Sequence, residues 1–171
     1  MLQSTDLLPL YAYLGGLSPL SRSRFAPHSF DWDFIKEIRL ENDHPLKRFV
    51  AVPADQSNIV AYILLLPGLE PGDLSRYKRR GQHIKPETSA SFAPSVAEDW
   101  QGSGLAISLS NYVETVAFDL GIRELVLWGG VQATNHRAIH FYEKIGYQRK
   151  GNFYFNGMDN IDMSKTLTRQ S

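Results

Sequence analysis

The segment Gln101-Gly102-Ser103-Gly104-Leu105-Ala106 lies between a predicted strand and the longest predicted helix of the chain. Its glycines and its alanine leave little side-chain bulk around the first amides of that helix. Those N–H groups have no partner inside the helix, and the helix dipole gives them positive character. A helix start of this kind can bind a pyrophosphate, because phosphates can approach its backbone closely. A glycine-x-glycine pair at a helix start is more often a simple turn, so the segment alone leaves both interpretations open.

The segment differs from two other phosphate-binding patterns. No Gly-Lys-Ser/Thr sequence follows it, which argues against a P-loop nucleotide site. The third glycine of a dinucleotide fingerprint is also missing, and no βαβ unit opens the chain. These two classes of phosphate site are therefore disfavoured.

A second motif follows one predicted strand later, in a helix that begins near Asn135. Its pattern is Asn-x-x-Ala-x-x-Phe-Tyr-x-x-x-Gly-Tyr, carried by Asn135, Ala138, Phe141, Tyr142, Gly146 and Tyr147. The first segment fits the pattern Gln/Arg-x-x-Gly-x-Gly/Ala through Gln101, Gly104 and Ala106. Together with the final segment from Asn156 to Leu167, these motifs resemble those of the GNAT superfamily of acetyltransferases. The resemblance covers about residues 47–167.

The resemblance implies that acetyl-CoA is the acyl donor. In the family, the strand before the first motif splays from its neighbour, and pantetheine pairs with the exposed backbone. By position that edge is Ser95, Val96 and Ala97, preceded by Pro94, which has no N–H group to pair. The amides that would hold the pyrophosphate are those of Gln101, Gly102, Ser103, Gly104, Leu105 and Ala106. Asn135 would bond the pantetheine arm or anchor its loop, although the same residue could be a plain helix cap.

Two side chains are expected to take part in the chemistry. Tyr142 stands where the family commonly has a phenol that donates a proton to the departing CoA thiolate. Outside this motif, a tyrosine at such a position would more often fill a helix–sheet interface. Glu98 is the leading candidate for a general base, because it directly follows the strand that should splay; Asp99 and Glu87 come next. Glu98 could equally be a charge that the helix dipole stabilises.

The expected reaction is transfer of the acetyl group from acetyl-CoA to a primary amine of a small molecule or peptide, by direct attack. The alternative is a catalytically silent acyl-CoA-binding sensor or interaction domain, which would keep the same donor motif. O-acylation is less favoured, because no serine–histidine arrangement is evident. In the family, the acceptor pocket is usually shaped by segments that correspond here to residues 17–30, 67–87 and 152–160.

Two further groups of side chains each allow a purely structural interpretation and a functional one. His136 and His140 lie four residues apart on one predicted helix, but no third ligand is evident, so we predict no metal site. Arg76, Lys78, Arg79 and Arg80 form a basic cluster. Such a run is usually solvated, and it could instead meet CoA phosphates or an acidic acceptor.

Hydrophobic spacing and turn residues predict the elements that position these residues. Helices are expected at 5–15, 19–25, 31–40, 103–119 and 135–145. Strands are expected at 47–52, 59–66, 88–96, 123–128, 152–156 and 160–167, with turns at 54–58 and at Asn156-Gly157 and an irregular loop at 67–87. Strand–helix–strand implies a parallel pair. The predicted fold class is α/β with a mixed sheet: GNAT-like, twisted, largely antiparallel, with one splayed parallel pair and helices on both faces.

Length and composition limit the remaining possibilities. The 171 residues suit one domain, residues 1–171, whose first family strand is missing or very short because only Met1–Ser4 precede the first helix. The formal net charge is zero, which argues against a general nucleic-acid or membrane-surface binder. There are no cysteines, so no disulfide or thiolate site forms. No export signal is evident, and we predict a cytoplasmic monomer or homodimer.

Overall fold

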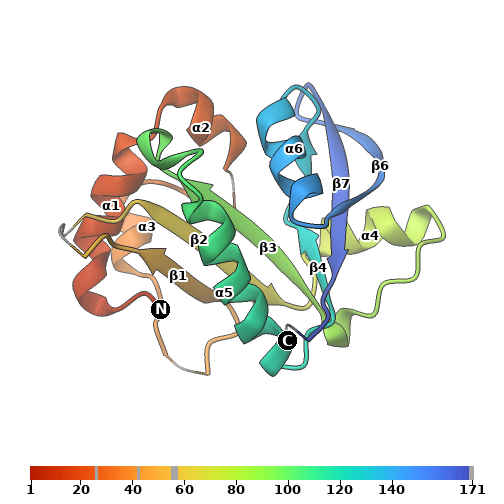
Figure 1. Cartoon of the computed structure of the whole chain (residues 1–171), viewed down its shortest axis with the longest axis horizontal. Helices are drawn as coiled ribbons and strands as arrows, with labels where there is room; N and C mark the ends of the chain where they lie inside the picture. Colours follow the sequence, from red (N-terminus) through yellow and green to blue (C-terminus); the bar gives the residue numbers. More distant parts are fainter. Residues whose placement is uncertain (26, 42, 55–57, 170–171) are drawn as a thin grey trace. The chain divides into compact units, whose positions relative to one another are not determined.

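A computed structural model describes residues 1–25, 27–41, 43–54 and 58–169 (Figure 1). The strands in this part of the chain are β1 (Lys47–Ala51), β2 (Ala61–Pro67), β3 (Ser89–Val96), β4 (Glu124–Leu127), β5 (Val131–Gln132), β6 (Gln148–Phe155) and β7 (Met158–Thr166). They form one mixed sheet in the order β1-β2-β3-β4-β7-β5, with β6 paired to β7. The predicted mixed α/β fold class is therefore confirmed.

The helices lie close to most of the predicted positions. They are α1 (Leu7–Gly16), α2 (Pro19–Arg24), α3 (Trp32–Lys36), α4 (Pro71–Arg79), α5 (Leu105–Asp119) and α6 (His136–Lys144), with short 3₁₀ helices at Ser4–Asp6, Pro86–Thr88 and Glu98–Trp100. Ser18 caps α2 by accepting a hydrogen bond from the Ser21 amide, and Asp31 caps α3 in the same way. Within the described residues, no helix is long and apolar enough to cross a membrane.

The chain divides into two compact units, each with its own buried side chains. The first comprises residues 1–64 and 93–111, and the second comprises residues 65–92 and 112–171. Fully buried residues of the first unit include Leu10, Leu14, Ile35, Phe49 and Tyr62. Those of the second include Tyr77, Phe92, Leu125, Val126 and Met163.

The predicted parallel strand pair is β3 and β4. Residues Ser89 to Phe92 pair with Glu124 to Leu127, and the Trp128 amide adds a hydrogen bond to the Phe92 carbonyl at 2.9 Å. β3 itself continues to Val96. The pairing therefore ends four residues before the strand does.

The residues before the first helix lie beside β1. Residues 1–3 have no assigned secondary structure. The Leu2 amide nevertheless donates to the Arg48 carbonyl of β1 at 2.9 Å, and the Leu2 side chain is buried. This backbone hydrogen bond attaches the segment to β1.

The final hairpin confirms the prediction made from Asn156-Gly157. Both residues have positive φ, 48° and 77°, as a two-residue hairpin turn requires. β6 begins four residues earlier than its predicted core, because a bulge between Arg149 and Gly151 admits the charged segment into the strand. The other predicted hairpin turn, at 54–58, includes residues 55–57, which lie outside the described residues.

The predicted irregular loop at 67–87 is wrong, because it contains α4. Glu70 caps this helix: its carboxylate accepts from the amides of Gly72 (2.7 Å) and Asp73 (3.1 Å). Pro71 occupies the first helical position, where its missing N–H costs nothing. Asp73 and Tyr77 are the buried residues of the helix. The high content of proline, glycine and basic residues concealed this local start signal.

We expect the Glu70→Ala variant to lower the free energy of unfolding by about 0.5–2 kcal/mol, because two amides at the start of α4 lose their acceptor. Urea denaturation measures this change. Glu87→Ala is the control, since the exposed Glu87 side chain accepts no hydrogen bond from any described residue. An equal loss in both variants would contradict the capping role.

Candidate functional site

The turn between β3 and α5 contains two glycines with left-handed backbone. The 3₁₀ helix Glu98–Trp100 comes first, and α5 begins at Leu105, two residues later than predicted. Gly102 and Gly104 have φ angles of 87° and 89°. A Cβ atom at Gly104 would meet no atom within 4 Å, so its backbone angle, and not a lack of space, calls for glycine there.

Alternate amides of this turn are left without a protein acceptor. The amides of Gln101 and Ser103 donate to the carbonyls of Glu98 and Trp100, and the Leu105 amide donates to the Ser103 hydroxyl. By contrast, the N–H groups of Gly102, Gly104 and Ala106 bond to no acceptor among the described residues. Three unpaired donors at the start of a 15-residue helix form a surface on which an anion can be held.

Backbone and side-chain hydrogen bonds within the first unit hold the end of β3 and the turn that follows it. The Gln101 amide group donates to the Val96 carbonyl at 3.0 Å, and the Ala97 N–H donates to the Val60 carbonyl at 2.9 Å. The Ser95 hydroxyl lies 2.8 Å from the Tyr13 hydroxyl. The predicted donor residues Ser95 to Ala97 and Gln101 to Ala106 are therefore continuous within one compact unit.

Tyr13 is a residue that the sequence analysis missed. It lies on the buried face of α1 with Leu10 and Leu14, and burial raises its pKa. A tyrosine hydroxyl on an apolar helix face needs a polar partner. That requirement is a signal the sequence contained, although it does not identify Ser95 as the partner.

The Glu98 carboxylate is occupied by hydrogen bonds at the start of α2. Its Oε1 accepts from the Ser21 hydroxyl at 2.5 Å and from the Ser18 amide at 3.1 Å. These bonds, that from Ser21 foremost, lower the pKa of Glu98 to about 2. Such a carboxylate is a weak base near neutral pH. Its assignment as general base stays a prediction, and the structure gives it a second role in tying α2 to the 3₁₀ helix before the turn.

Asn135 and Tyr142 belong to the second unit. Asn135 caps α6 by accepting from the Ala138 amide at 3.3 Å. Tyr142 is buried on α6, with ring centroids 5.3 Å from Phe141 and 5.5 Å from Tyr147. Burial raises the pKa of Tyr142, so its phenol stays protonated at neutral pH. A neutral phenol has a proton to donate, but its raised pKa makes it a weaker acid than an exposed tyrosine.

The histidines and the basic cluster have different surroundings. His136 and His140 are exposed, and no group of three or more potential ligands in the described part of the chain is placed to hold a metal ion. In the basic cluster, Arg76 and Arg80 make ion pairs with the buried Asp162. Arg79 is exposed and bonds Ser75. The cluster thus includes two arginines that are engaged inside the second unit.

Comparison with known proteins identifies a family model and several structures. The model of the acetyltransferase (GNAT) family matches residues 17–147. No curated protein sequence matches the chain. Among solved structures, the GNAT domain of S. lividans PAT is similar with a TM-score of 0.72 and 19% identity over 95% of this chain and 86% of that one.

Two other solved structures have the same fold. A variant of spermidine N-acetyltransferase SpeG from Vibrio cholerae has a TM-score of 0.67 and 23% identity, over 96% of this chain and 92% of that one. AAC(6')-Ib in complex with paromomycin and acetyl-CoA has a TM-score of 0.70 and 17% identity, over 97% and 90%. At these identities the likeness concerns the fold alone.

The hydrogen bonds of Glu98 predict a pH-dependent contribution to stability. A carboxylate whose pKa is lowered in the fold stabilises it above the unfolded value of about 4.5, and this stabilisation disappears as the pH falls through about 2. We expect Glu98→Gln to have a lower Tm than the natural chain at neutral pH, with the difference shrinking over this acidic range. Thermal unfolding at several pH values measures it.

Asp99→Asn is the matched control, because the Asp99 side chain is exposed and bonds no described residue. Its Tm should follow that of the natural chain at every pH. A difference for Glu98→Gln that stays constant with pH would contradict the assigned hydrogen bonds. Loss of all enzyme activity in Glu98→Gln, with the fold intact, would instead support its role as general base.

Proposed function

Because the chain belongs to the GNAT family of acetyltransferases, we propose that it transfers the acetyl group of acetyl-CoA to a primary amine of a small molecule or peptide. The amine would attack the thioester directly, without a covalent enzyme intermediate. The observation that carries this proposal is the row of three unpaired amides at Gly102, Gly104 and Ala106. They supply donors for a pyrophosphate, and they occur in the residues that match the first family motif.

Donor binding is assigned to the backbone of the first unit. The pyrophosphate oxygens would accept hydrogen bonds from the unpaired amides at the start of α5, where the helix dipole also favours negative charge. The backbone of Ser95 to Ala97 would bond the amide groups of pantetheine. The end of the β3–β4 pairing at Phe92 supports this assignment, since β3 continues for four residues beyond it. In the second unit, Asn135 is proposed to anchor its loop through its cap and to bond the pantetheine arm.

The proposed reaction replaces the C–S bond of the thioester with the C–N bond of an amide. The amine nitrogen attacks the thioester carbon, the C–N bond forms, and the C–S bond breaks to release CoA thiolate. Tyr142 is the proposed acid that protonates the thiolate, because it holds the motif position at which the family commonly has this phenol. The acceptor ammonium first gives one proton to water or to a general base, for which Glu98 stays a candidate, so that a neutral amine attacks. The second N–H proton is lost as the amide forms, and it returns to the Tyr142 phenolate through solvent. Positioning and hydrogen bonds to the developing oxyanion would supply most of the rate enhancement.

The alternative function is a silent acyl-CoA-binding domain. Every donor contact described above would be the same in such a protein, because none of them requires turnover. The protonated and buried Tyr142 favours the enzyme, since a sensor has no need of an acid at that position. A cytoplasmic location, a single domain and a monomeric or homodimeric state remain predictions.

A thiol-release assay with acetyl-CoA tests the proposed function directly. The acceptor panel should contain polyamines and aminoglycosides, which the names of similar structures mention, together with amino acids, amino sugars and peptide N-termini. We expect CoA release that depends on one class of amine, with mass spectrometry showing an acetylated product. Tight acetyl-CoA binding without turnover on any amine would favour the silent domain.

The Tyr142→Phe variant should lower kcat by about 10²-fold or more, because the thiolate would leave without its acid. Acetyl-CoA affinity should be retained, since the ring and its packing are kept; calorimetric titration measures it. Tyr147→Phe is the control, because the Tyr147 hydroxyl is buried and bonds no described partner. Unchanged kcat in Tyr142→Phe would remove Tyr142 from the mechanism.

The two ends of α5 offer a matched pair of glycine variants. Gly104 and Gly121 have φ angles of 89° and 86°, and a Cβ atom at either would meet no atom within 4 Å. Alanine should therefore destabilise the fold by a similar amount, about 1–2 kcal/mol, at both positions. Only Gly104→Ala should weaken acetyl-CoA binding, because only Gly104 contributes to the row of unpaired amides. Equal acetyl-CoA affinity in the two variants would contradict the donor site.

A further inference from the structure

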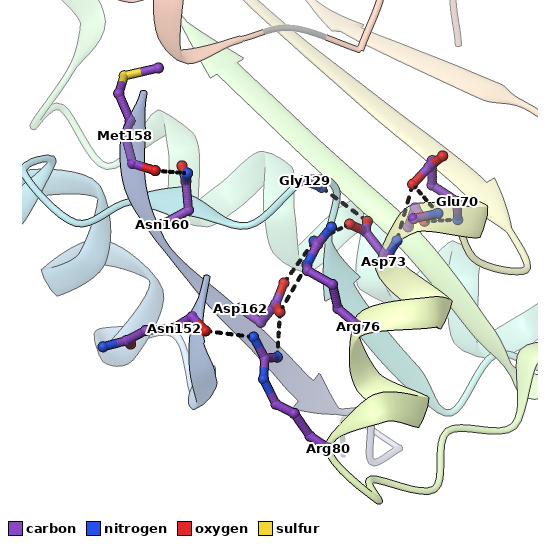
Figure 2. A network of polar contacts seen from close by, with 11 residues as sticks. Glu70, Asp73, Arg76, Arg80, Gly129, Asn152, Met158, Asn160 and Asp162 are labelled. Carbon is purple, nitrogen blue, oxygen red and sulfur yellow. Dashed lines mark hydrogen bonds and ion pairs between the residues drawn. The ribbon is translucent and has the colours of Figure 1, made fainter. Parts of the chain in front are cut away.

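Three carboxylates are buried in the described part of the second unit, those of Asp73, Glu114 and Asp162. Two of them belong to one network of ion pairs (Figure 2). Asp73 bonds Arg76 through one oxygen and accepts from the Gly129 amide at 3.0 Å through the other. Both oxygens of Asp162 are bonded by Arg76 and Arg80. Each oxygen of these two carboxylates therefore has a partner.

The side chains of this network are closely packed as well as paired. A Cβ atom at Gly151 would lie 2.8 Å from Nε of Arg80. Arg76 stacks over the Phe153 ring, 3.8 Å from its centroid. Arg80 also donates to the Asn152 carbonyl at 2.8 Å. The carboxylates of the network thus have no acceptor to offer a ligand.

The carboxylate of Glu114 differs from the other two. Its Oε2 accepts from Nζ of Lys165 at 2.6 Å, which links α5 to β7. Its Oε1 has no hydrogen-bond partner among the described residues, although the side chain is only 3% exposed. Removing a charged oxygen from water without giving it a donor costs free energy. A group that brings a donor to Oε1 would recover that free energy.

Glu114 and Lys165 line a pocket of about 160 Å³ beside the last turns of α5. Its apolar wall is formed by Phe118 and Leu167. The Arg123 guanidinium stacks over the Phe118 ring, 3.9 Å from its centroid, and so holds that wall in place. A cavity of about 150 Å³ accommodates benzene, so the pocket suits a ligand of about six to nine non-hydrogen atoms.

The charges that line the pocket are balanced. Asp119 and Arg169 complete the set, which then has two carboxylates and two cations. Both are exposed and bond no described residue, and Nζ of Lys165 has further N–H groups beside the one that Glu114 accepts. A ligand with a single charge would meet a like charge in this pocket. A ligand that carries both signs would find a partner for each.

We propose that this pocket binds a small zwitterion, namely a free amino acid with a short apolar side chain. Its ammonium group would bond Glu114 and Asp119, and its carboxylate would bond Lys165 and Arg169. Its side chain would lie against the apolar wall. Rotation about the soft terminal torsion of Glu114 would bring Oε1 to the ligand.

This site shares no residue with the proposed donor site or with the proposed acid and base. The ligand would therefore be bound there without being acetylated, and the inference does not rest on the proposed acetyl transfer. A water molecule is the simplest other partner for Oε1, and the unpaired Tyr147 hydroxyl could share it. One water, however, would fill only a small part of the pocket and would leave its exposed charges unpaired.

The test uses L-valine as the probe, in the absence of acetyl-CoA. Isobutylamine and isovalerate are matched analogues that lack the carboxylate and the ammonium group respectively. An NMR titration gives each Kd and locates the ligand through the amide signals of Thr115 and Thr168, which line the pocket. We expect a Kd for valine of about 1 mM or tighter. Each analogue should bind at least about tenfold more weakly, because it loses charge-assisted hydrogen bonds.

Two variants and two controls test the assigned partners. Asp119→Asn and Arg169→Met each remove one charge of the pocket. Their controls are Asp159→Asn and Arg79→Met, which change exposed side chains of the same unit that do not line it. We expect each variant to raise the Kd of valine about two- to fivefold, because ion pairs of exposed groups are weak, and each control to leave it unchanged. Glu114 is kept, because its loss would leave the largely buried Lys165 ammonium without its partner.

Absence of saturable valine binding would overturn the inference and leave water as the partner of Glu114. Analogues that bind as tightly as valine would also overturn it. So would signal shifts confined to residues outside the pocket, or equal losses in the variants and their controls. None of these outcomes bears on acetyl transfer, which the thiol-release assay decides separately.

Discussion

The parallel pairing of β3 with β4 is the constraint on which the rest of the structure depends. Two parallel neighbours need a crossover between them, and α5 provides it. The chain must leave β3 and enter α5 within a few residues, which places left-handed glycines at positions 102 and 104. The same reversal leaves alternate amides unpaired. The proposed donor-binding geometry is therefore a consequence of how a strand is joined to a helix.

Protonation in this fold is controlled by two opposite local environments. Hydroxyl and amide donors of α2 surround the Glu98 carboxylate and hold it charged. Apolar and aromatic packing around Tyr142 does the reverse and keeps a phenol neutral. Tyr142 is a candidate because it lies in a family motif, and Glu98 because it follows the strand expected to splay, but only their surroundings indicate which of them has a proton to give.

The sequence predicts best where one residue type has few alternatives. Asn156-Gly157 specifies a tight hairpin turn, and Gly102 with Gly104 marks the entry to α5. Prediction from the sequence fails where contacts between residues far apart in the chain determine the surroundings of a side chain. The basic cluster suggested solvated surface, yet Arg76 and Arg80 pair with Asp162, more than 80 positions away along the chain. Likewise, nothing near Tyr13 in sequence points to Ser95, and the charged start of β6 joins the sheet only through its bulge.

The close approach of Arg80 to Gly151 should restrict which residues can replace them in related proteins. A side chain at position 151 would occupy the space of the Arg80 guanidinium, whose Nε lies 2.8 Å from the place of a Cβ atom. A residue larger than glycine at 151 would thus force the Arg80 guanidinium to leave its observed position. Loss of the arginine would in turn leave the buried carboxylate of Asp162 short of a partner. Substitutions at positions 80, 151 and 162 should accordingly covary, although these positions lie on a helix end and two different strands.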